Sequence, residues 1–264
     1  MSDLLEIVVL GIVQGLSEFL PISSDGHLVI VAALFEHFTG RHRPDVLERS
    51  VALHAGTLLA VLTVFGRDLI QALLHDRRVL ALLVVGTLPA VAVGLAGDRY
   101  FKHWLESPLL AGAGLIVTGI VLLWGTRGKR GEATYPTLPY DQALSIGVFQ
   151  AAAILPGVSR SGLTIASGMR AGLTGRDAAT YSFLLSIPAV AGACLLEGLK
   201  IARSTTPGST PLAELAIGAA AAFVVGLAAL LWLLRLLRTG RLHLFAYYTI
   251  PLGLVVLAWQ LWFQ

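Results

Sequence analysis

Charged side chains are scarce in this chain of 264 residues. Only 13% of its residues are Asp, Glu, Lys or Arg, whereas 56% are hydrophobic and the mean hydropathy is +0.77. A soluble domain has about 25% charged residues, and it needs them to cover its apolar core with a polar surface. The composition therefore excludes an ordinary soluble enzyme and a disordered chain, and it predicts a membrane protein that crosses the bilayer several times.

Cysteine is almost absent as well. The single Cys194 lies in an apolar run, so no disulfide can form within the chain and the redox compartment cannot be read from cysteine usage. The N-terminus lacks the basic segment of a cleavable signal peptide, because its first apolar region opens with the acids Asp3 and Glu6. The net charge of +3 is scattered over short polar segments, so we expect no nucleic-acid partner.

Long apolar stretches dominate the sequence. Six of them are long enough, or nearly so, for a membrane-spanning helix of about 20 residues. They are residues 51–65, 79–97, 108–125, 179–199, 212–234 and 243–263. Two further apolar regions, 4–38 and 142–174, are each interrupted by proline, glycine and serine. Because proline removes a backbone donor and stops a helix, each interrupted region is predicted to form two half-helices joined by a turn.

The two interrupted regions resemble each other. GIVQ at 11–14 is similar to GVFQ at 147–150. LPISSDG at 20–26 is similar to LPGVSRSG at 155–162 once one inserted residue is dropped. Chance matches do occur in a sequence rich in Ala, Leu, Gly and Val, but this pair of matches keeps the same order and indicates an internal repeat.

A second similarity joins TLPAVA at 87–92 to SIPAVA at 186–191. We therefore expect one membrane domain made of two related halves, residues 1–130 and 131–264, each with one broken hairpin followed by three spans. An odd number of spans inverts the second half relative to the first, so the two hairpin turns can meet near the middle of the bilayer. The predicted fold is an all-α polytopic membrane protein, an inverted repeat with six transmembrane helices plus two re-entrant helical hairpins.

Basic residues indicate the orientation. Eleven of the 19 Lys and Arg residues fall on the side that holds 66–78, 126–141, 170–176 and 235–242, seven fall on the other side, and Arg160 lies in the second break. Cytoplasmic loops are enriched in Lys and Arg. We therefore expect the side with eleven to face the cytoplasm and both termini to face outside.

The first break gathers side chains that are costly to bury in hydrocarbon unless they pair, meet water or do chemistry. They are Gln14, Glu18, Ser23, Ser24, Asp25 and His27. Gln14 and Glu18 are four residues apart and share one helix face. Pro21 ends that helix, so residues 23–25 are predicted to lie in the turn, and His27 opens the next apolar run.

The second break places Arg160 between Ser159 and Ser161, with Thr164 one helical turn later. A guanidinium fork, hydroxyl donors and free backbone N–H groups at the start of a half-helix suit phosphate. The alternative is a structural ion pair between a carboxylate and Arg160, which would leave the surrounding hydroxyls and imidazole unexplained. The two breaks together predict a carboxylate–imidazole–hydroxyl half that faces a phosphate-binding half.

The sequences at both breaks resemble the signature motifs of the undecaprenyl-diphosphate phosphatase family, also called the bacitracin-resistance family. QGLSEFLPISSDGH at 14–27 is similar to a Glu/Gln-x-x-x-Glu motif followed by Pro-x-Ser-Ser-x-Gly-His, and PGVSRSGLT at 156–164 is similar to Pro-Gly-x-Ser-Arg-Ser-x-x-Thr. The resemblance covers the whole chain. It implies a plasma-membrane phosphatase that hydrolyses undecaprenyl diphosphate at the outer face, with a Mg²⁺ or Ca²⁺ ion. This reaction recycles the lipid carrier for peptidoglycan synthesis and confers bacitracin resistance.

The resemblance also implies roles for single residues. The catalytic set is Glu18, Ser24, His27 and Arg160. The substrate-binding set is Ser23, His54, Ser159, Arg160, Ser161 and Thr164. The resemblance places Gln14 and Glu18 in the acidic motif, and the expected metal ligands are Gln14, Glu18 and, as a departure from the family pattern, Asp25. Many family members carry Glu where this chain has Gln14 and Thr where it has Asp25, so Asp25 either supplies the missing ligand or caps the half-helix after it.

Four questions stay open at this point. His54 in the motif LHAGT either contacts the diphosphate or is an ordinary histidine at a helix end. The nucleophile is Ser24 after it loses its proton to His27, or His27 itself, or a water activated by Glu18 or His27. An inverted-repeat transporter or flippase of a phosphorylated lipid carrier would show the same charges. Small residues at 111–119 permit close helix packing, either within the chain or in a homodimer.

Overall fold

The computed structural model describes residues 3–39, 46–100, 107–127, 131–203 and 210–263, and within these ranges it is helical without β-strands. The first five helices are α1 (Asp3–Phe19), α2 (Ser24–Thr39), α3 (Val46–His75), α4 (Arg77–Tyr100) and α5 (Pro108–Gly125). The other five are α6 (Tyr140–Ala152), α7 (Arg160–Arg170), α8 (Gly175–Arg203), α9 (Leu212–Arg238) and α10 (Ala246–Phe263). Two short 3₁₀ helices, η2 (Tyr135–Thr137) and η3 (Leu242–Phe245), precede α6 and α10.

Six helices are long and apolar enough to cross a membrane, which confirms the predicted number of spans. They cover 48–75, 77–96, 108–125, 175–203, 212–238 and 242–262. The predicted span at 51–65 is too short, because α3 continues to His75. Asp76 alone separates α3 from α4, and its carboxylate caps α4 by accepting from the N–H groups of Arg78 and Val79, each at 3.0 Å.

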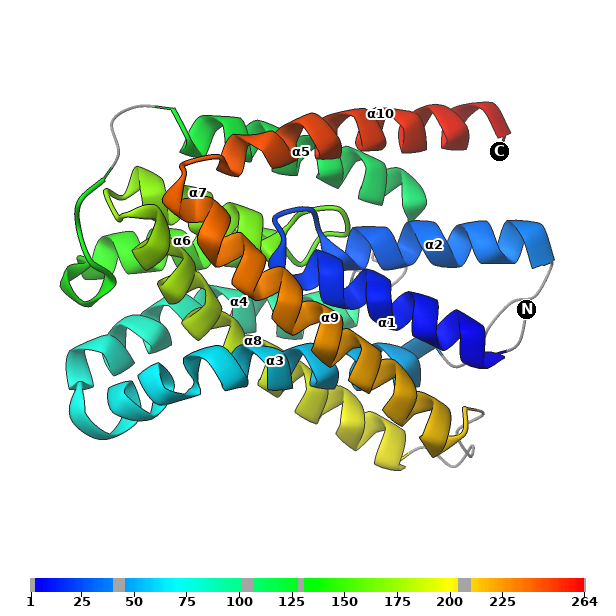
Figure 1. Cartoon of the computed structure of the whole chain (residues 1–264), viewed down its shortest axis with the longest axis horizontal. Coiled ribbons are helices and arrows are strands. Elements are labelled where there is room, and N and C mark those ends of the chain that lie inside the picture. Colours follow the sequence, from blue (N-terminus) through cyan, green and yellow to red (C-terminus); the bar gives the residue numbers. More distant parts are fainter. Residues whose placement is uncertain (1–2, 40–45, 101–106, 128–130, 204–209, 264) are drawn as a thin grey trace.

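The other four helices form two broken hairpins, α1–α2 and α6–α7, as predicted. They contain between 11 and 17 residues each, which is short for a helix that must cross a bilayer. Figure 1 shows that the two hairpins point toward each other from opposite ends of the molecule and that their turns meet in its middle. The fold thus brings both sequence breaks to one place.

Helix pairing repeats when the two halves are exchanged. Helix α1 packs on α9, its counterpart α6 packs on α4, and the two last helices, α5 and α10, pack on each other. The similarity of TLPAVA to SIPAVA is not part of this repeat, and that part of the prediction is wrong. TLPAVA lies in α4, which is the second helix after its hairpin. SIPAVA lies in α8, which is the first helix after its hairpin.

The ends of the molecule agree with the predicted two sides. Figure 1 places the α3–α4 turn and the α9–α10 connection at one end, and the start of α1 and the end of α10 at the other. Five of the basic residues counted for the orientation lie outside the described residues. They are Arg41, Arg43, Lys102, Lys129 and Arg130. Residue 130, the predicted end of the first half, is one of them.

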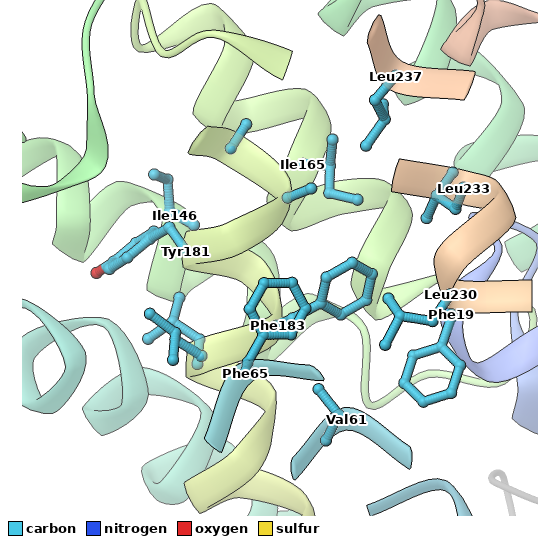
Figure 2. Close-up of a cluster of buried hydrophobic side chains, with 14 of the residues drawn as sticks. Phe19, Val61, Phe65, Ile146, Ile165, Tyr181, Phe183, Leu230, Leu233 and Leu237 are labelled. Carbon is cyan, nitrogen blue, oxygen red and sulfur yellow. The ribbon is translucent and has the colours of Figure 1, made fainter. Parts of the chain in front are cut away.

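An aromatic core fixes the end of α1 (Figure 2). The ring of Phe183 from α8 meets the edge of Phe19 at 5.7 Å between centroids and stacks on Phe65 from α3 at 5.6 Å. All three side chains are buried, and aromatic pairs of this geometry add about 0.5–1.5 kcal/mol each to the gain from burial. Since Phe19 is the last residue of α1, this core sets the position of Glu18 beside it.

The second tip is held by α5. Thr118 donates its hydroxyl to the carbonyl of Gly157 and accepts the N–H of Ser159, both at 2.8 Å. Gly157 has a φ of +81° and no room for a side chain, because a Cβ there would collide with the carbonyl oxygen of Ala111. The tips themselves touch where Gly26 approaches Gly157: a Cβ on Gly26 would lie 2.7 Å from the Gly157 Cα.

Candidate active site

Both half-helices that follow the breaks begin with the same cap. The Ser23 hydroxyl accepts the N–H of Gly26 at 3.3 Å, and the Ser159 hydroxyl accepts the N–H of Gly162 at 3.1 Å. The prediction that residues 23–25 form the turn is therefore wrong for the last two of them, since α2 begins at Ser24. Capping by Asp25 is excluded as well, because Ser23 supplies the cap. Ser23 adopts a left-handed φ of 72°, which is unusual for a residue other than glycine.

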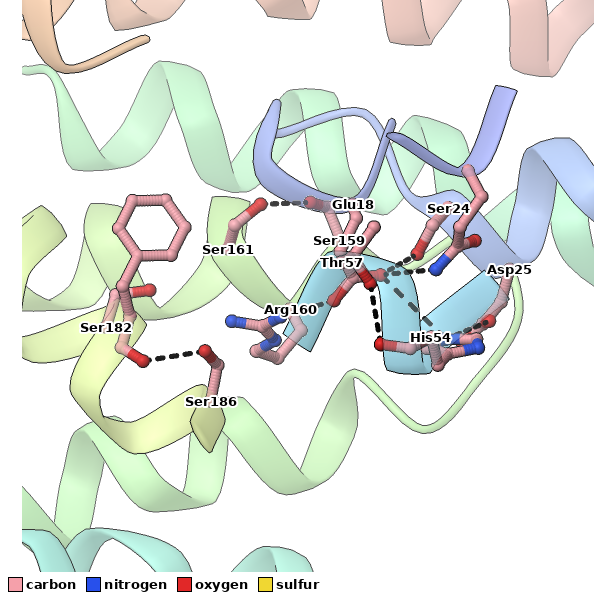
Figure 3. Close-up of polar contacts among 12 residues, drawn as sticks. Glu18, Ser24, Asp25, His54, Thr57, Ser159, Arg160, Ser161, Ser182 and Ser186 are labelled. Carbon is pink, nitrogen blue, oxygen red and sulfur yellow. Dashed lines mark hydrogen bonds and ion pairs between the residues drawn. The ribbon is translucent and has the colours of Figure 1, made fainter. Parts of the chain in front are cut away.

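The first residue of each capped helix binds the same carboxylate (Figure 3). Ser24 donates its hydroxyl to Glu18 Oε2 at 2.7 Å, and Arg160 Nη2 donates to Glu18 Oε1 at 2.5 Å. The Glu18 and Arg160 side chains are 7% and 16% exposed, so a nearly buried ion pair joins the two tips. This confirms the predicted meeting of the carboxylate half with the guanidinium half.

Two polar atoms of this cluster are buried and have no partner within the described chain. Gln14 donates its Nε2 to Glu18 Oε2 at 3.2 Å, but its carbonyl oxygen Oε1 is unpaired. The second guanidinium nitrogen of Arg160, Nη1, is unpaired too. A buried polar group without a partner costs about 1–3 kcal/mol, and more when it is charged. The site thus offers one free cationic donor and one free acceptor to a ligand.

His54 supplies the imidazole of the site. It lies inside α3, and its Nε2 is 3.9 Å from Glu18 Oε2 and 3.8 Å from Asp25 Oδ1. Its Nδ1 lies 2.9 Å from the carbonyl oxygen of Ser50. A carbonyl can only accept, so Nδ1 donates to it, and this bond turns Nε2 toward the two carboxylates. His54 is therefore not an isolated helix-end histidine, because it faces two carboxylates.

His27 points elsewhere. Its Nδ1 bonds the carbonyl of Ser23 at 2.7 Å and its Nε2 bonds the hydroxyl of Tyr248 in α10 at 2.8 Å. Both ring nitrogens are thus occupied by groups other than Glu18 and Arg160. The structure brings together the predicted Glu18, Ser24 and Arg160 but does not bring His27 into contact with them.

The hydroxyl groups of the second break bind protein groups. Ser161 donates to the carbonyl of Leu20 at 3.2 Å, and its oxygen lies 3.2 Å from that of Ser159. Thr164 donates to the carbonyl of Arg160 at 2.7 Å and lies 2.6 Å from the hydroxyl of Ser182 in α8. These side chains, predicted to bind substrate, fix the tip and the backbone of Arg160.

Three residues that support the site are not among those predicted from the sequence. Thr118 and Ser182 are single hydroxyls in apolar spans, and a polar residue inside such a span was the signal that could have drawn attention to them. Tyr248 gave no signal, because tyrosine is common near membrane interfaces. All three act on the site from other helices: Thr118 from α5, Ser182 from α8 and Tyr248 from α10.

A divalent cation would find oxygen donors here. Gln14 Oε1 is free and adjoins the Glu18 carboxylate, and the Asp25 carboxylate is 56% exposed beside them. Such oxygens are the ligands that Mg²⁺ and Ca²⁺ take in proteins. In the described part of the chain, no three or more His, Cys, Asp or Glu side chains converge as a metal site would require. The donor chemistry fits a cation, and the metal stays a prediction.

Comparison with known proteins places the chain in a family. The family described as "Bacitracin resistance protein BacA" matches residues 7–255, a range that contains every site residue above. The chain belongs to this family. The undecaprenyl-diphosphatase of Rhodopirellula baltica is 48% identical to it over 97% of this chain and 98% of that protein. The undecaprenyl-diphosphatase of Desulfatibacillum aliphaticivorans is 39% identical over 96% and 97%. Undecaprenyl-diphosphatase 4 of Bacillus cereus is 37% identical over 97% of each.

Proposed function

We infer that the chain is an integral membrane phosphatase that hydrolyses undecaprenyl diphosphate to undecaprenyl phosphate and inorganic phosphate. The relatives at 37–48% identity carry the name of this activity, and they match nearly the whole chain. The observation that carries the proposal is the contact of Arg160 with Glu18 across the two tips, with Nη1 of Arg160 buried and unpaired. Bacitracin resistance and the recycling of the carrier for cell-wall synthesis follow from the family and the reaction.

Arg160 holds the substrate in this proposal. Its free Nη1 donates to an oxygen of the diphosphate, while its Nη2 stays with Glu18. A guanidinium binds phosphate through parallel N–H groups in a fixed plane, and the cap of α7 together with the Thr164 bond to the Arg160 carbonyl sets the direction of that plane. The positive end of α7 adds to the attraction for the anion.

Ser24 is the nucleophile that the geometry favours, with Glu18 as its base. The Ser24 hydroxyl already donates to Glu18 Oε2 at 2.7 Å, whereas the ring nitrogens of His27 bind Ser23 and Tyr248. Ser24 Oγ attacks the terminal phosphorus as its proton passes to Glu18, and the bond from that phosphorus to the bridging oxygen breaks. Undecaprenyl phosphate leaves, and water then cleaves the phosphoserine to release inorganic phosphate.

His54 is placed to take part in the second half of the reaction. Its Nε2 faces the same carboxylate oxygen of Glu18 that accepts from Ser24. When Nε2 carries no proton, it can accept one from the attacking water. A divalent cation held by Gln14, Glu18 and Asp25 would supply positive charge to the phosphate oxygens.

We propose in addition that the protein lies in the plasma membrane with the site open to its outer face. The excess of Lys and Arg at one end of the helices supports this orientation. A homodimer remains a prediction from small residues at 111–119. The names of the relatives do not favour the alternative of a transporter or flippase.

Phosphate release by protein purified in detergent tests the proposed function. Detergent removes the two sides that transport needs, so a transporter would release nothing. We expect release from undecaprenyl diphosphate, loss of release in Glu18→Gln, and a lower rate after a chelator removes divalent cations. Phosphate release by the wild type with no loss in Glu18→Gln would move the reaction away from this site.

A further inference from the structure

A cavity lined by basic residues lies away from the hairpin tips, where α5, α7 and α9 end and α8 begins. It has a volume of about 440 Å³, and four arginines line it. They are Arg127, Arg170, Arg176 and Arg238. Among the described residues that line the cavity there is no Asp or Glu. None of the residues of the candidate active site contributes to it, so it is a separate site.

Among the described residues, no carboxylate forms an ion pair with the arginines of this cavity. Arg170 donates to the carbonyl of Arg127 at 2.9 Å and lies over the ring of Trp124 at 5.3 Å, so uncharged groups hold it in place. The carboxylate of nearby Asp177 is already bonded to the hydroxyl of Thr174 and the N–H of Tyr135.

The start of α8 adds further positive potential. Gly175, the first residue of α8, lines the cavity together with Arg176 in the same first turn. The N-terminus of a helix carries a partial positive charge, and the first turn of α8 holds the acid Asp177 as well as Arg176. Asp177 and the Thr174 cap offset part of the helix dipole, so the guanidinium groups supply most of the attraction for an anion in the cavity. This arrangement differs from Arg238, which lies at the C-terminus of α9 where a cation is favoured.

We propose that this cavity binds a phosphate-bearing anion. Guanidinium groups around a hollow of this size suit a phosphate group and its oxygens. Two sources share that chemistry: the headgroup of an anionic phospholipid and free inorganic phosphate. The cavity lies where membrane spans end, and basic pockets between such helix ends bind lipid headgroups in membrane proteins. Trp124 beside Arg170 is a residue type typical of that border.

The test uses the full chain in a neutral detergent and measures bound lipid by native mass spectrometry. The cavity variant is Arg176→Gln with Arg238→Gln. The matched control is Arg235→Gln with Arg241→Gln, which removes the same charge, is equally exposed at the same end of the molecule, and lies outside the cavity. The probes are phosphatidylglycerol, phosphatidylcholine as a neutral lipid, and inorganic phosphate. Phosphate release from undecaprenyl diphosphate checks that each variant is folded.

We expect the wild type and the control to bind phosphatidylglycerol in preference to phosphatidylcholine, and the cavity variant to bind it at least tenfold more weakly. This result supports the lipid source. If inorganic phosphate raises the melting temperature of the wild type and the control but not of the cavity variant, and all three proteins bind phosphatidylglycerol equally, the free anion is the ligand. Equal binding of both probes by all three proteins, or equal loss in cavity variant and control, overturns the proposal. Should the double variant fail to fold, Arg238→Gln is compared with Arg235→Gln on the same helix.

Discussion

The two hairpin tips have the same backbone construction and opposite chemistry. Each begins its second half-helix with a serine cap, Ser23 or Ser159, that accepts an N–H three residues later. The residue after the cap is a hydroxyl in the first tip, Ser24, and a guanidinium in the second, Arg160. Both bind Glu18. The repeat therefore supplies a scaffold with two equivalent positions, and different side chains at those positions divide the reaction between nucleophile and phosphate binding.

The helices before the breaks show the same division. Gln14 and Gln150 occupy equivalent positions in the repeat, and each is buried with an unpaired carbonyl oxygen. Four residues after Gln14 comes Glu18, whereas four residues after Gln150 comes Ile154. Gln150 donates instead to the backbone of Gly86 at 3.4 Å. Only the first tip has a carboxylate, so acid–base chemistry belongs to that half alone.

Removing that carboxylate is expected to have the largest effect. In Glu18→Gln the side chain keeps its shape, but it can no longer accept the proton of Ser24 or pair with the charge of Arg160. General base catalysis contributes about 10²–10⁴ to a rate, so phosphate release from undecaprenyl diphosphate is expected to fall by about that factor. The amount of membrane-inserted protein, measured beside it, is expected to stay near that of the wild type. Loss of inserted protein would indicate that Glu18 and Arg160 form only a structural pair.

Variants of Ser23 and Ser24 distinguish the structural role of the first tip from its role in the reaction. Ser24→Ala removes the proposed nucleophile, and we expect phosphate release to fall by about 10² or more. Ser23→Ala removes the cap and is expected to cost about 1 kcal/mol of stability while it retains most of the activity. Rapid quenching and mapping of the phosphorylated residue checks the mechanism: a phosphoserine at Ser24 is expected. A Ser24→Ala variant within tenfold of the wild type would make water the nucleophile.

Arg160→Lys changes the second tip alone. The ammonium keeps the positive charge but loses the planar fork that contacts Glu18 and the phosphate at the same time. We expect a fall of at least tenfold in kcat/KM, which corresponds to ~1.4 kcal/mol of transition-state stabilisation. The rate at varied substrate concentration measures it. An unchanged kcat/KM would show that charge without geometry is sufficient, and would remove the directional role given to the α7 cap.

Two histidines provide a finer comparison. His54 faces Glu18 and Asp25, whereas His27 is bonded to Ser23 and Tyr248. We expect His54→Gln to slow turnover of a trapped phosphoenzyme by about tenfold, because it removes a proton acceptor. His27→Gln alters the bonds to Ser23 and Tyr248. We expect the effect of losing the Tyr248 bond to be shared with Tyr248→Phe, so that the double variant loses less than the sum in a double-mutant cycle. Additive losses in that cycle would give His27 a role of its own.

Local signals predicted much of this fold and site. Hydropathy found six spans, prolines found the two breaks, and the motif residues Glu18, Ser24 and Arg160 do meet. The helix boundary at Ser24 was missed because it depends on the left-handed backbone of Ser23, which serine does not signal. The partner of His27 was missed because Tyr248 is 221 residues away, and only the packing of α10 brings it near. Contacts fixed by packing between distant helices leave no pattern in a single sequence.

The contact of Thr118 with the second tip carries the smallest expected effect on chemistry and the clearest effect on stability. Thr118→Val is nearly isosteric, but it leaves the Gly157 carbonyl and the Ser159 N–H without their partner in a buried place. Each unpaired group costs about 1–3 kcal/mol, so we expect a lower melting temperature in detergent. Arg160 follows Ser159 directly, and a looser tip holds its guanidinium less well. We therefore expect KM to rise while kcat changes less than threefold. Thr63→Val in α3, whose exposed hydroxyl bonds only within its own helix, is the matched control and is expected to change neither value. A variant of Thr118 with wild-type stability and KM would show that α5 does not position the phosphate-binding tip.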